Sequence, residues 1–182
     1  MIQEELRKQT EASHHQLEKL VIAKLKKIYS DEDYVNLLKI FFAYFIRLEV
    51  AVKPYISSEI LPDYAERRHA ASLADDIISL GFMPSALPDV IVPSIDNTVK
   101  ALGALYVMEG SIMGGRIIIQ MLDKRGITQG ISFFAGYGSD TETRWSSFVE
   151  VLDHYIKAEN MQEAIQAAKQ TISNLADVFL QA

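Results

Sequence analysis

The sequence predicts an all-α protein made of several helices. Apolar residues recur at the three- and four-residue spacing of amphipathic helices, and no stretch alternates convincingly between apolar and polar residues over the length of a strand. Residues that start or stop helices also recur along the chain, such as Ser30, Pro54 and Gly81. Because 182 residues suffice to bury a large core, we expect residues 1–182 to form a single domain.

Two long helical segments are expected in the first third of the chain. Residues 2–28 carry an apolar face and form one or two helices. Ser30 then has the residue type of an N-cap, and the helix that it begins runs to about Lys53, where a proline follows. Residues 37–45 of this helix are apolar nearly all round, so we expect it to be the buried central helix.

The rest of the chain is expected to form four more helices joined by loops. Gly81 suits the end of the first of them, because glycine commonly follows the last helical residue, and Ser94 suits the N-cap of the next. In chain order we expect a helix over 63–80, a loop over 82–93 that holds Pro84, Pro88 and Pro93, a helix from Ser94 to near Gly126, a loop over 130–138, and helices over 140–157 and 160–181.

The composition excludes several classes of protein. The chain has no cysteine, which excludes disulfides, thiolate-ligated zinc or heme, iron–sulfur clusters and covalent c-type heme attachment. Its net charge of −6 argues against broad binding to nucleic acid or to anionic membranes. The chain lacks the run of about 18 apolar residues that a membrane span needs, and its first residues do not resemble a signal peptide. We therefore expect a cytoplasmic protein without a membrane span.

Three glycines interrupt the helix expected around residues 105–120. Gly110, Gly114 and Gly115 lie within one and a half turns, and each interior glycine costs about 1 kcal/mol of helix stability relative to alanine. Glycine has no Cβ, so it allows another group to come close to the backbone. That group can be a neighbouring helix or a flat ligand that lies across the helix, and this stretch alone leaves both interpretations open.

His14 is the histidine with the most informative neighbours. It lies four residues after Thr10 and four before Glu18, so the three side chains share one face of a helix, whereas the adjacent His15 points about 100° away. Glu18 could hold the His14 ring in one tautomer, as carboxylates do for metal-ligating histidines, although a lone helical histidine is more often structural. The other two histidines are expected at the surface: His69 and His154.

A non-heme di-iron site is one alternative. Glu11 and His14 have the Glu-x-x-His spacing of di-iron helical proteins, and Glu66 and His69 repeat it. Two acids that interrupt otherwise apolar helices could complete such a site: Glu49 and Glu109. This spacing also arises by chance, and a buried Glu49 could instead pair with Arg47 or another cation.

Two segments taken together resemble the bacterial heme oxygenases. Residues 6–18 match the family's order of Leu-Arg, Thr, His and Leu-Glu, and residues 106–115 match its Tyr-Val, Glu-Gly-Ser and Gly-Gly pattern. Residues 133–138, followed by Arg144 and Trp145, are similar to the family's C-terminal segment. The resemblance spans nearly the whole chain, and it implies the family's multihelical fold.

The resemblance also implies roles for particular residues. His14 would be the proximal iron ligand, with Glu18 beside it, and the glycine-bearing helix would be the distal helix that lies against the heme face. The residues implied on the distal side are Gly110, Ser111, Gly114 and Gly115. The resemblance implies three partners for the heme propionates, although Arg7 can equally be a surface residue and Tyr106 can merely fill the core: Arg7, Tyr106 and Arg144.

Two departures separate this chain from the animal-type pattern. Ser111 stands where animal-type enzymes carry an aspartate that anchors a distal water network, and the basic pair of their later helix is not evident near Ser146 and Val151.

The implied activity is cleavage of heme to biliverdin, carbon monoxide and ferrous iron. It would use dioxygen and an external electron donor, a ferredoxin or a reductase, because the chain has no flavin or nucleotide motif. A non-catalytic heme carrier or sensor is the second alternative.

Overall fold

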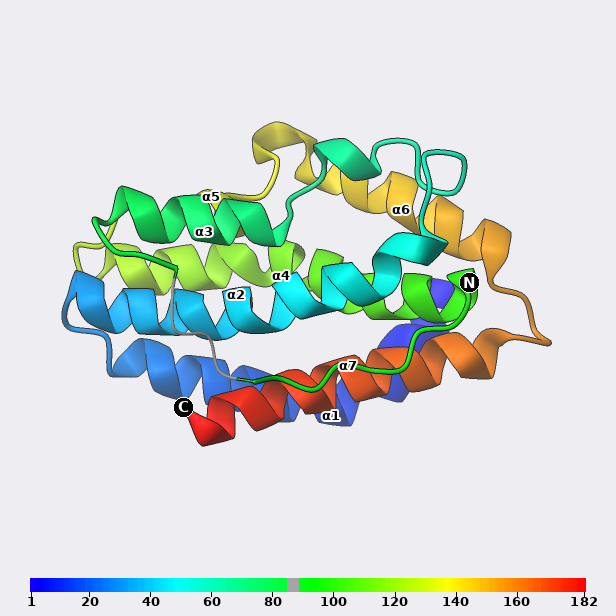
Figure 1. Ribbon diagram of the computed structural model, residues 1–182, viewed down its shortest axis with the longest axis horizontal. Helices are drawn as coiled ribbons and strands as arrows, with labels where there is room; N and C mark the ends of the chain where they lie inside the picture. The colour runs from blue at the N-terminus through cyan, green and yellow to red at the C-terminus, as the bar shows by residue number, and fades with distance from the viewer. Residues whose placement is uncertain (85–88) are drawn as a thin grey trace.

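The computed structural model describes residues 1–84 and 89–182, so Pro88 and part of the loop expected over 82–93 lie outside the described residues. Within these two ranges the structure contains helices and turns but no strand, which confirms the all-α prediction (Figure 1). The elements in chain order are α1 (Ile2–Lys26), α2 (Asp31–Val52), η1 (Lys53–Tyr55), η2 (Tyr64–Glu66), α3 (Ala70–Ser79), α4 (Thr98–Asp123), α5 (Ser132–Ala135), η3 (Gly138–Asp140), α6 (Thr141–Tyr155) and α7 (Met161–Gln181).

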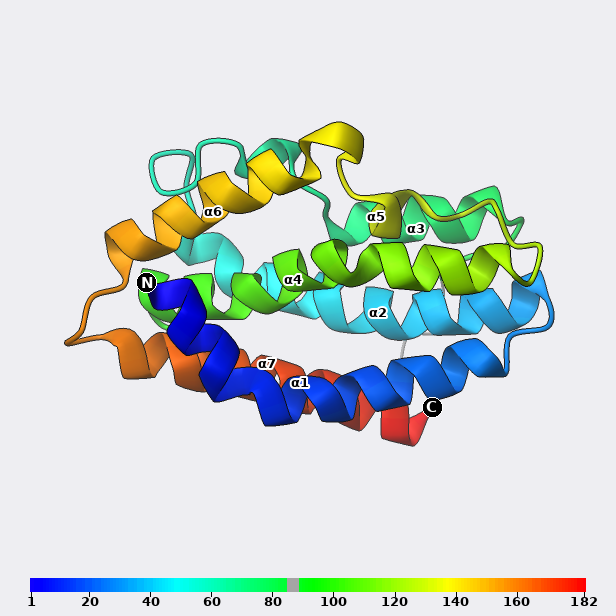
Figure 2. The same ribbon diagram turned by 180° about the vertical axis from the view of Figure 1, so that it is seen from behind.

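The helices form three layers. α1 and α7 pack against each other on one side, α2 and α4 lie in the middle, and α3, α5 and α6 cover the opposite side (Figures 1 and 2). Within residues 37–45 of α2 every residue except Lys39 is buried, so the prediction of a buried central helix is confirmed. The buried apolar side chains form one continuous core that includes residues from all seven α-helices.

Local capping fixes the starts of α2 and α4. The Ser30 hydroxyl accepts a hydrogen bond from the Asp33 amide at 3.1 Å, as predicted from its residue type. The cap of α4 was expected at Ser94 but lies at Asn97, whose side-chain oxygen accepts from the Lys100 amide at 2.9 Å. Asparagine caps helices as well as serine does, and here it is the residue nearest to the helix.

The helix expected over 63–80 is shorter than predicted, because α3 begins only at Ala70. The backbone at Arg67 and His69 is extended, with ψ angles of 165° and 171°. Arg67 is drawn into the interior, where its side chain is 1% exposed. The N-terminus of α3 is capped from another helix, because the Glu49 carboxylate of α2 accepts from the Ala70 amide at 2.6 Å.

A second remote carboxylate holds the segment expected to be a loop over 130–138. This segment contains the four-residue helix α5, and the Asp76 carboxylate of α3 accepts from the amides of Ser132 and Phe133, both at 2.9 Å. The Tyr34 hydroxyl of α2 donates to the Gly130 carbonyl at 2.7 Å. Contacts from α2 and α3 therefore position a segment that is far from them in sequence.

α4 is the one helix of the described residues that is long and apolar enough to cross a membrane. Half of its most apolar window is buried inside the bundle, where it contacts α2, α5, α6 and α7. A helix that forms the core of a bundle has the same length and composition.

Candidate functional site

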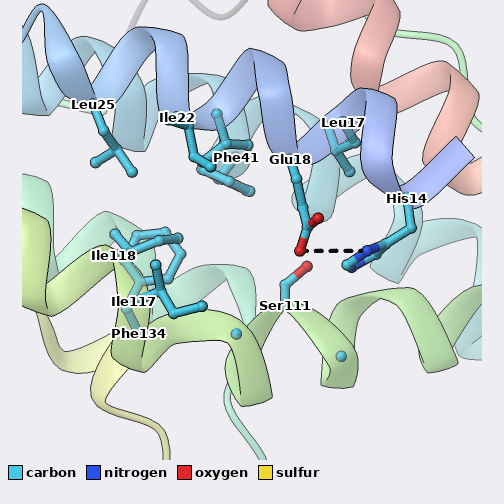
Figure 3. A pocket seen from close by; sticks show the side chains of 13 residues that line it. His14, Leu17, Glu18, Ile22, Leu25, Phe41, Ser111, Ile117, Ile118 and Phe134 are labelled. Atoms are coloured by element: carbon cyan, nitrogen blue, oxygen red, sulfur yellow. Dashed lines mark ion pairs between the residues drawn. The ribbon is translucent and has the colours of Figure 1, made fainter. Parts of the chain in front are cut away.

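A cleft separates α1 from α4 (Figure 3). It consists of two adjoining cavities of about 120 and 390 Å³, which share five lining residues: His14, Leu17, Glu18, Gly110 and Ser111. Together the two cavities fall in the range of roughly 300–1,000 Å³ that is usual for cofactor and small-molecule sites. Residues 6–18 and 106–115, which the sequence singled out, therefore form the two walls of one cleft.

The two ends of the cleft differ in chemistry. The smaller cavity is apolar, and beyond the shared residues it is lined by Val21, Ile22, Leu25, Phe41, Gly114, Ile117, Ile118 and Phe134. The larger cavity carries the polar and charged groups, and it is lined by Gln3, Arg7, Thr10, Glu11, His15, Tyr106, Val107, Met113, Trp145 and Ile172. A ligand with one apolar and one polar edge matches this asymmetry.

His14 projects from α1 into the cleft and lines both cavities (Figure 3). His15 lines only the larger cavity. Glu18 lies between the two histidines: its carboxylate is 3.6 Å from Nδ1 of His14 and 3.2 Å from Nδ1 of His15. The Thr10 hydroxyl donates to the Leu6 carbonyl of its own helix at 2.8 Å and is buried. Thr10 therefore helps α1 to pack, and its hydroxyl proton is committed to its own helix.

The three glycines within residues 110–115 of α4 serve two different purposes. A Cβ on Gly110 or Gly114 would meet no atom within 4 Å, because both residues face the open cleft. Gly115 is buried on another face of α4, and a Cβ there would collide with the carbonyl of Phe134 in α5. The expectation that Gly115 faces a ligand is not supported, because the structure places it in helix packing. Gly110 and Gly114 thus leave space for a ligand, whereas Gly115 allows close packing against a neighbouring helix.

Ser111 lies between the glycines and lines both cavities. Its side chain points from α4 into the cleft on the side where Glu18 approaches (Figure 3). The Ser111 hydroxyl donates to the Val107 carbonyl at 2.9 Å, so its proton is committed to the helix and its lone pairs remain available to accept a hydrogen bond.

Arg7 and Tyr106 meet at the polar end of the cleft. The Tyr106 ring is half-buried and lies 5.7 Å from the ring of Trp145. Burial raises the pKa of the Tyr106 hydroxyl, and the positive charge of Arg7 opposes that rise, so the guanidinium is within electrostatic range of the hydroxyl. The structure thus brings two of the three predicted propionate partners together.

Arg144, the third predicted propionate partner, does not line either cavity of the cleft. Its guanidinium is 3.0 Å from an Asp63 oxygen and 3.3 Å from a Glu66 oxygen, and it lies over the ring of Tyr137. These contacts engage Arg144 with the segment before α3 and with Tyr137.

Sequence reasoning did not find a buried ion pair between Arg67 and Glu109. An Arg67 nitrogen is 2.8 Å from a Glu109 oxygen, and the side chains are 1% and 7% exposed. Burial raises the pKa of Glu109, and Arg67 opposes that rise. An acid within an apolar helix indicates that a cation from another segment pairs with it, but no local pattern identifies which cation.

His69 was expected at the surface, but it is half-buried between two acceptors. Its Nδ1 is 3.2 Å from the Glu49 carboxylate, and its Nε2 is 2.7 Å from the Tyr64 carbonyl. Since both partners can only accept, the ring is best satisfied when both nitrogens carry protons. The hydrogen bond with Glu49 raises the pKa of His69 against the opposing effect of burial. His154, in contrast, is exposed as expected.

The residues of the di-iron alternative do not converge. Within residues 1–84 and 89–182 no three histidine, aspartate or glutamate side chains lie close enough to share a metal ion. The acids that this alternative requires are engaged elsewhere: Glu49 with His69, Glu66 with Arg144 and Glu109 with Arg67. The geometry therefore gives the di-iron alternative no support.

Comparison with solved structures defines the class of fold. The crystal structure of the NO- and CO-bound heme oxygenase from Neisseria meningitidis superimposes with a TM-score of 0.84 and 24% sequence identity. The match covers 100% of this chain and 91% of that one. The chain therefore has the all-α heme oxygenase fold.

Comparison with curated proteins adds sequence similarity. The chain is 31% identical over 94 residues to the heme oxygenase of Xanthomonas campestris pv. campestris strain 8004. The match covers 50% of this chain and 54% of that relative, so it spans about half the length of each. No family model matches the chain. The resemblance to bacterial heme oxygenases is thus confirmed, in fold along the whole chain and in sequence along half of it.

Proposed function

We propose that the protein is a heme oxygenase, which binds heme in the cleft between α1 and α4 and cleaves it to biliverdin, carbon monoxide and ferrous iron. The observation that carries the proposal is the placement of His14 on one wall, opposite the side-chain-free backbone of Gly110 and Gly114 on the other. Open space where two Cβ atoms would stand leaves room for a flat ring against α4. The fold and the sequence similarity support the same conclusion.

His14 is the proposed iron ligand, and Glu18 is proposed to hold its ring. A carboxylate beside Nδ1 favours the tautomer in which Nδ1 carries the proton and Nε2 is free to ligate. Bound heme would supply both the iron at which dioxygen is reduced and the ring that is oxidised. A histidine ligand is compatible with this chemistry, since a thiolate ligand favours O–O cleavage instead.

The α4 wall would restrict the space above the ring without supplying a side-chain acid. Among residues 105–115 the only titratable groups are Tyr106, at the polar end of the cleft, and Glu109, which is buried against Arg67. Arg116 follows this segment and is exposed. Backbone groups, the Ser111 oxygen and ordered water would therefore make the hydrogen bonds on this side.

The polar end of the cleft is proposed to receive the heme propionates. Arg7 supplies a cation there, and the Tyr106 hydroxyl supplies a donor beside it. The apolar edge of the ring would then lie toward the smaller cavity, among residues such as Leu25 and Phe134. This orientation follows from matching the propionates to the end that holds Arg7 and Tyr106, and apolar surface to the apolar end.

Three further points belong to the same proposal. Electrons are proposed to come from a separate donor, a ferredoxin or a reductase, because the chain has no flavin or nucleotide motif. Residues 1–182 are proposed to act as a single domain, since one apolar core joins the helices. We also propose that the protein acts in the cytoplasm.

A hemin titration followed by reduction in air tests the proposed function. We expect a one-to-one Soret band that bleaches, as a biliverdin band rises, when ascorbate or a ferredoxin system is added. Tight binding without bleaching under either reductant would instead identify a heme carrier or sensor. Absence of specific binding would refute the heme-binding proposal altogether.

A further inference from the structure

The side of the cleft that α4 forms at Gly110 and Gly114 is called the glycine wall below. The ion pair between Arg67 and Glu109 lies directly behind this wall. Glu109 precedes Gly110, which lines both cavities, and its own carboxylate points into the protein interior. All three nitrogens of the Arg67 guanidinium are engaged: one at 2.8 Å from Glu109, one at 2.8 Å from Asp63 and one at 3.0 Å from the Arg144 carbonyl. Arg67 thus ties α4 both to the segment before α3 and to α6.

A second fixed point lies at the other end of the wall. Gly115 is packed so closely against Phe134 of α5 that no side chain fits between the two backbones. α5 is held in turn by hydrogen bonds from its amides to Asp76 of α3. Four of the α4 residues that line the cleft lie between the two fixed points: Gly110, Ser111, Met113 and Gly114.

Without such anchors this stretch would be the weakest part of α4. Glycines reduce helix stability, and three of them lie within residues 110–115. On the cleft side, Gly110 and Gly114 have no neighbouring atom against which to pack. The position of the wall must therefore be set by contacts on its far side.

We propose that Arg67 and Glu109 are positioning residues, which clamp α4 at Glu109 while the Gly115–Phe134 contact holds it at the other end, so that the glycine wall keeps one position relative to His14. Neither side chain lines the cleft, so both act through the backbone of α4. The clamp itself is a property of the protein alone. Its consequence, a single seating of heme and hence one dominant biliverdin isomer, rests on the proposed function.

Hydrogen exchange of the heme-free full chain tests the clamp directly. Glu109→Gln keeps the shape of the side chain but removes the charge that Arg67 faces. We expect amide exchange over residues 107–115 to become faster by about tenfold or more, because breaking a buried pair weakens the region that it holds. The matched control is Glu49→Gln, which breaks the partly buried pair between Glu49 of α2 and His69, the residue before α3; neither residue lines the cleft.

The control decides between a clamp and a general loss of stability. Faster exchange over residues 107–115 in Glu109→Gln, and wild-type exchange there in Glu49→Gln, would support the clamp. Wild-type exchange there in Glu109→Gln, or equal acceleration in both variants, would overturn it. If Glu109→Gln fails to fold, Asp63→Asn takes its place under the same criteria, because Asp63 is the partly exposed carboxylate that also holds Arg67.

The consequence for heme has its own readouts. In the ferric cyanide complex of Glu109→Gln we expect additional heme-methyl proton resonances, which report a second seating, together with a changed ratio of biliverdin isomers. Glu49→Gln should retain the wild-type pattern in both. One unchanged set of resonances in Glu109→Gln would overturn the link to heme seating. A wild-type protein that binds no hemin would refute the proposed function, while the exchange comparison would still decide the clamp.

Discussion

Gly110 and Gly115 lie five residues apart on α4 and face different surroundings: Gly110 borders the open cleft, and Gly115 lies against the carbonyl of Phe134. The absence of a side chain therefore has a different meaning at each position. At Gly110 it leaves space for a ligand, and at Gly115 it allows two pieces of backbone to pack. Alanine substitutions at the two positions should have opposite effects on stability.

Gly110→Ala should stabilise the heme-free protein while it weakens heme binding. Alanine favours a helix by about 1 kcal/mol over glycine, and the new methyl group meets no protein atom. The same methyl group would intrude on a ring bound against α4, so we expect hemin affinity to fall by about tenfold or more. Thermal unfolding and hemin titration measure the two effects. Unchanged affinity would show that the ring does not lie against Gly110.

Gly115→Ala should destabilise the heme-free protein. Its Cβ would collide with the backbone of Phe134, and overpacking of this kind costs about 1–3 kcal/mol. Chemical denaturation measures the free energy of unfolding. A variant at least as stable as the wild type would contradict the close packing of α4 against α5.

His14→Ala should abolish the spectrum of histidine-ligated heme. His14 lines both cavities and is the proposed iron ligand. Added imidazole should restore the spectrum in part, because it can occupy the space of the missing ring. His15→Ala is the matched control and should retain a wild-type spectrum, since His15 lines only the larger cavity. A wild-type spectrum in His14→Ala would transfer the role to His15 or to no specific residue.

Arg7→Gln should weaken hemin binding moderately. An exposed ion pair contributes about 0.2–1 kcal/mol, so we expect a loss of at most about fivefold that shrinks as salt is added. Lys8→Gln is the control, because Lys8 has the same charge but lines neither cavity of the cleft. Hemin titrations at low and high salt give the measurement. Equal losses in the two variants would indicate a nonspecific effect of charge.

The free energy of unfolding should fall as pH rises above about 6.5, the ordinary pKa of histidine. The hydrogen bond to Glu49 raises the pKa of His69 in the folded protein, with Glu109 and the Tyr64 carbonyl adding to the effect. Below pH 6.5 or so the ring is charged in both states, and its stabilising contribution is fully present. That contribution is lost as pH rises through the raised pKa, because only the folded protein still holds the proton there.

His69→Gln should remove this part of the pH dependence, and His154→Gln should not, because His154 is exposed. Urea denaturation at several pH values from about 6 to 9, which span the ordinary histidine pKa, would measure how the free energy of unfolding depends on pH. A pH dependence in His69→Gln equal to that of the wild type would contradict the charged pair with Glu49.

The sequence predicted those parts of the fold that depend on local interactions. The period of apolar residues located the helices, and Ser30 marked the start of α2 because its hydrogen bond reaches only to Asp33. The predicted start of α3 was wrong, because the group that caps this helix is the Glu49 carboxylate of another helix. A pattern read in one segment carries no information on a partner that only tertiary packing supplies.

The same distinction applies to the site. The spacing of His14 and Glu18 placed both on the face of α1 that borders the cleft, and the glycines located the opposite wall. Sequence alone could not separate the ligand-facing Gly114 from the packed Gly115, because they are neighbours whose faces depend on where α5 lies. The contacts of Arg144 could not be predicted for a similar reason, since its acidic partners come from a segment about eighty residues away.

The hydrogen bonds from α5 to Asp76 imply an order of folding. A helix of four residues is too short to persist alone, and the acceptors for two of its amides lie 56 and 57 residues earlier in the chain. We therefore expect α5 to form only after α3 has docked. Because Phe134 both lines the apolar end of the cleft and backs Gly115, we expect the ligand cavity to be completed late, after the helical layers have assembled.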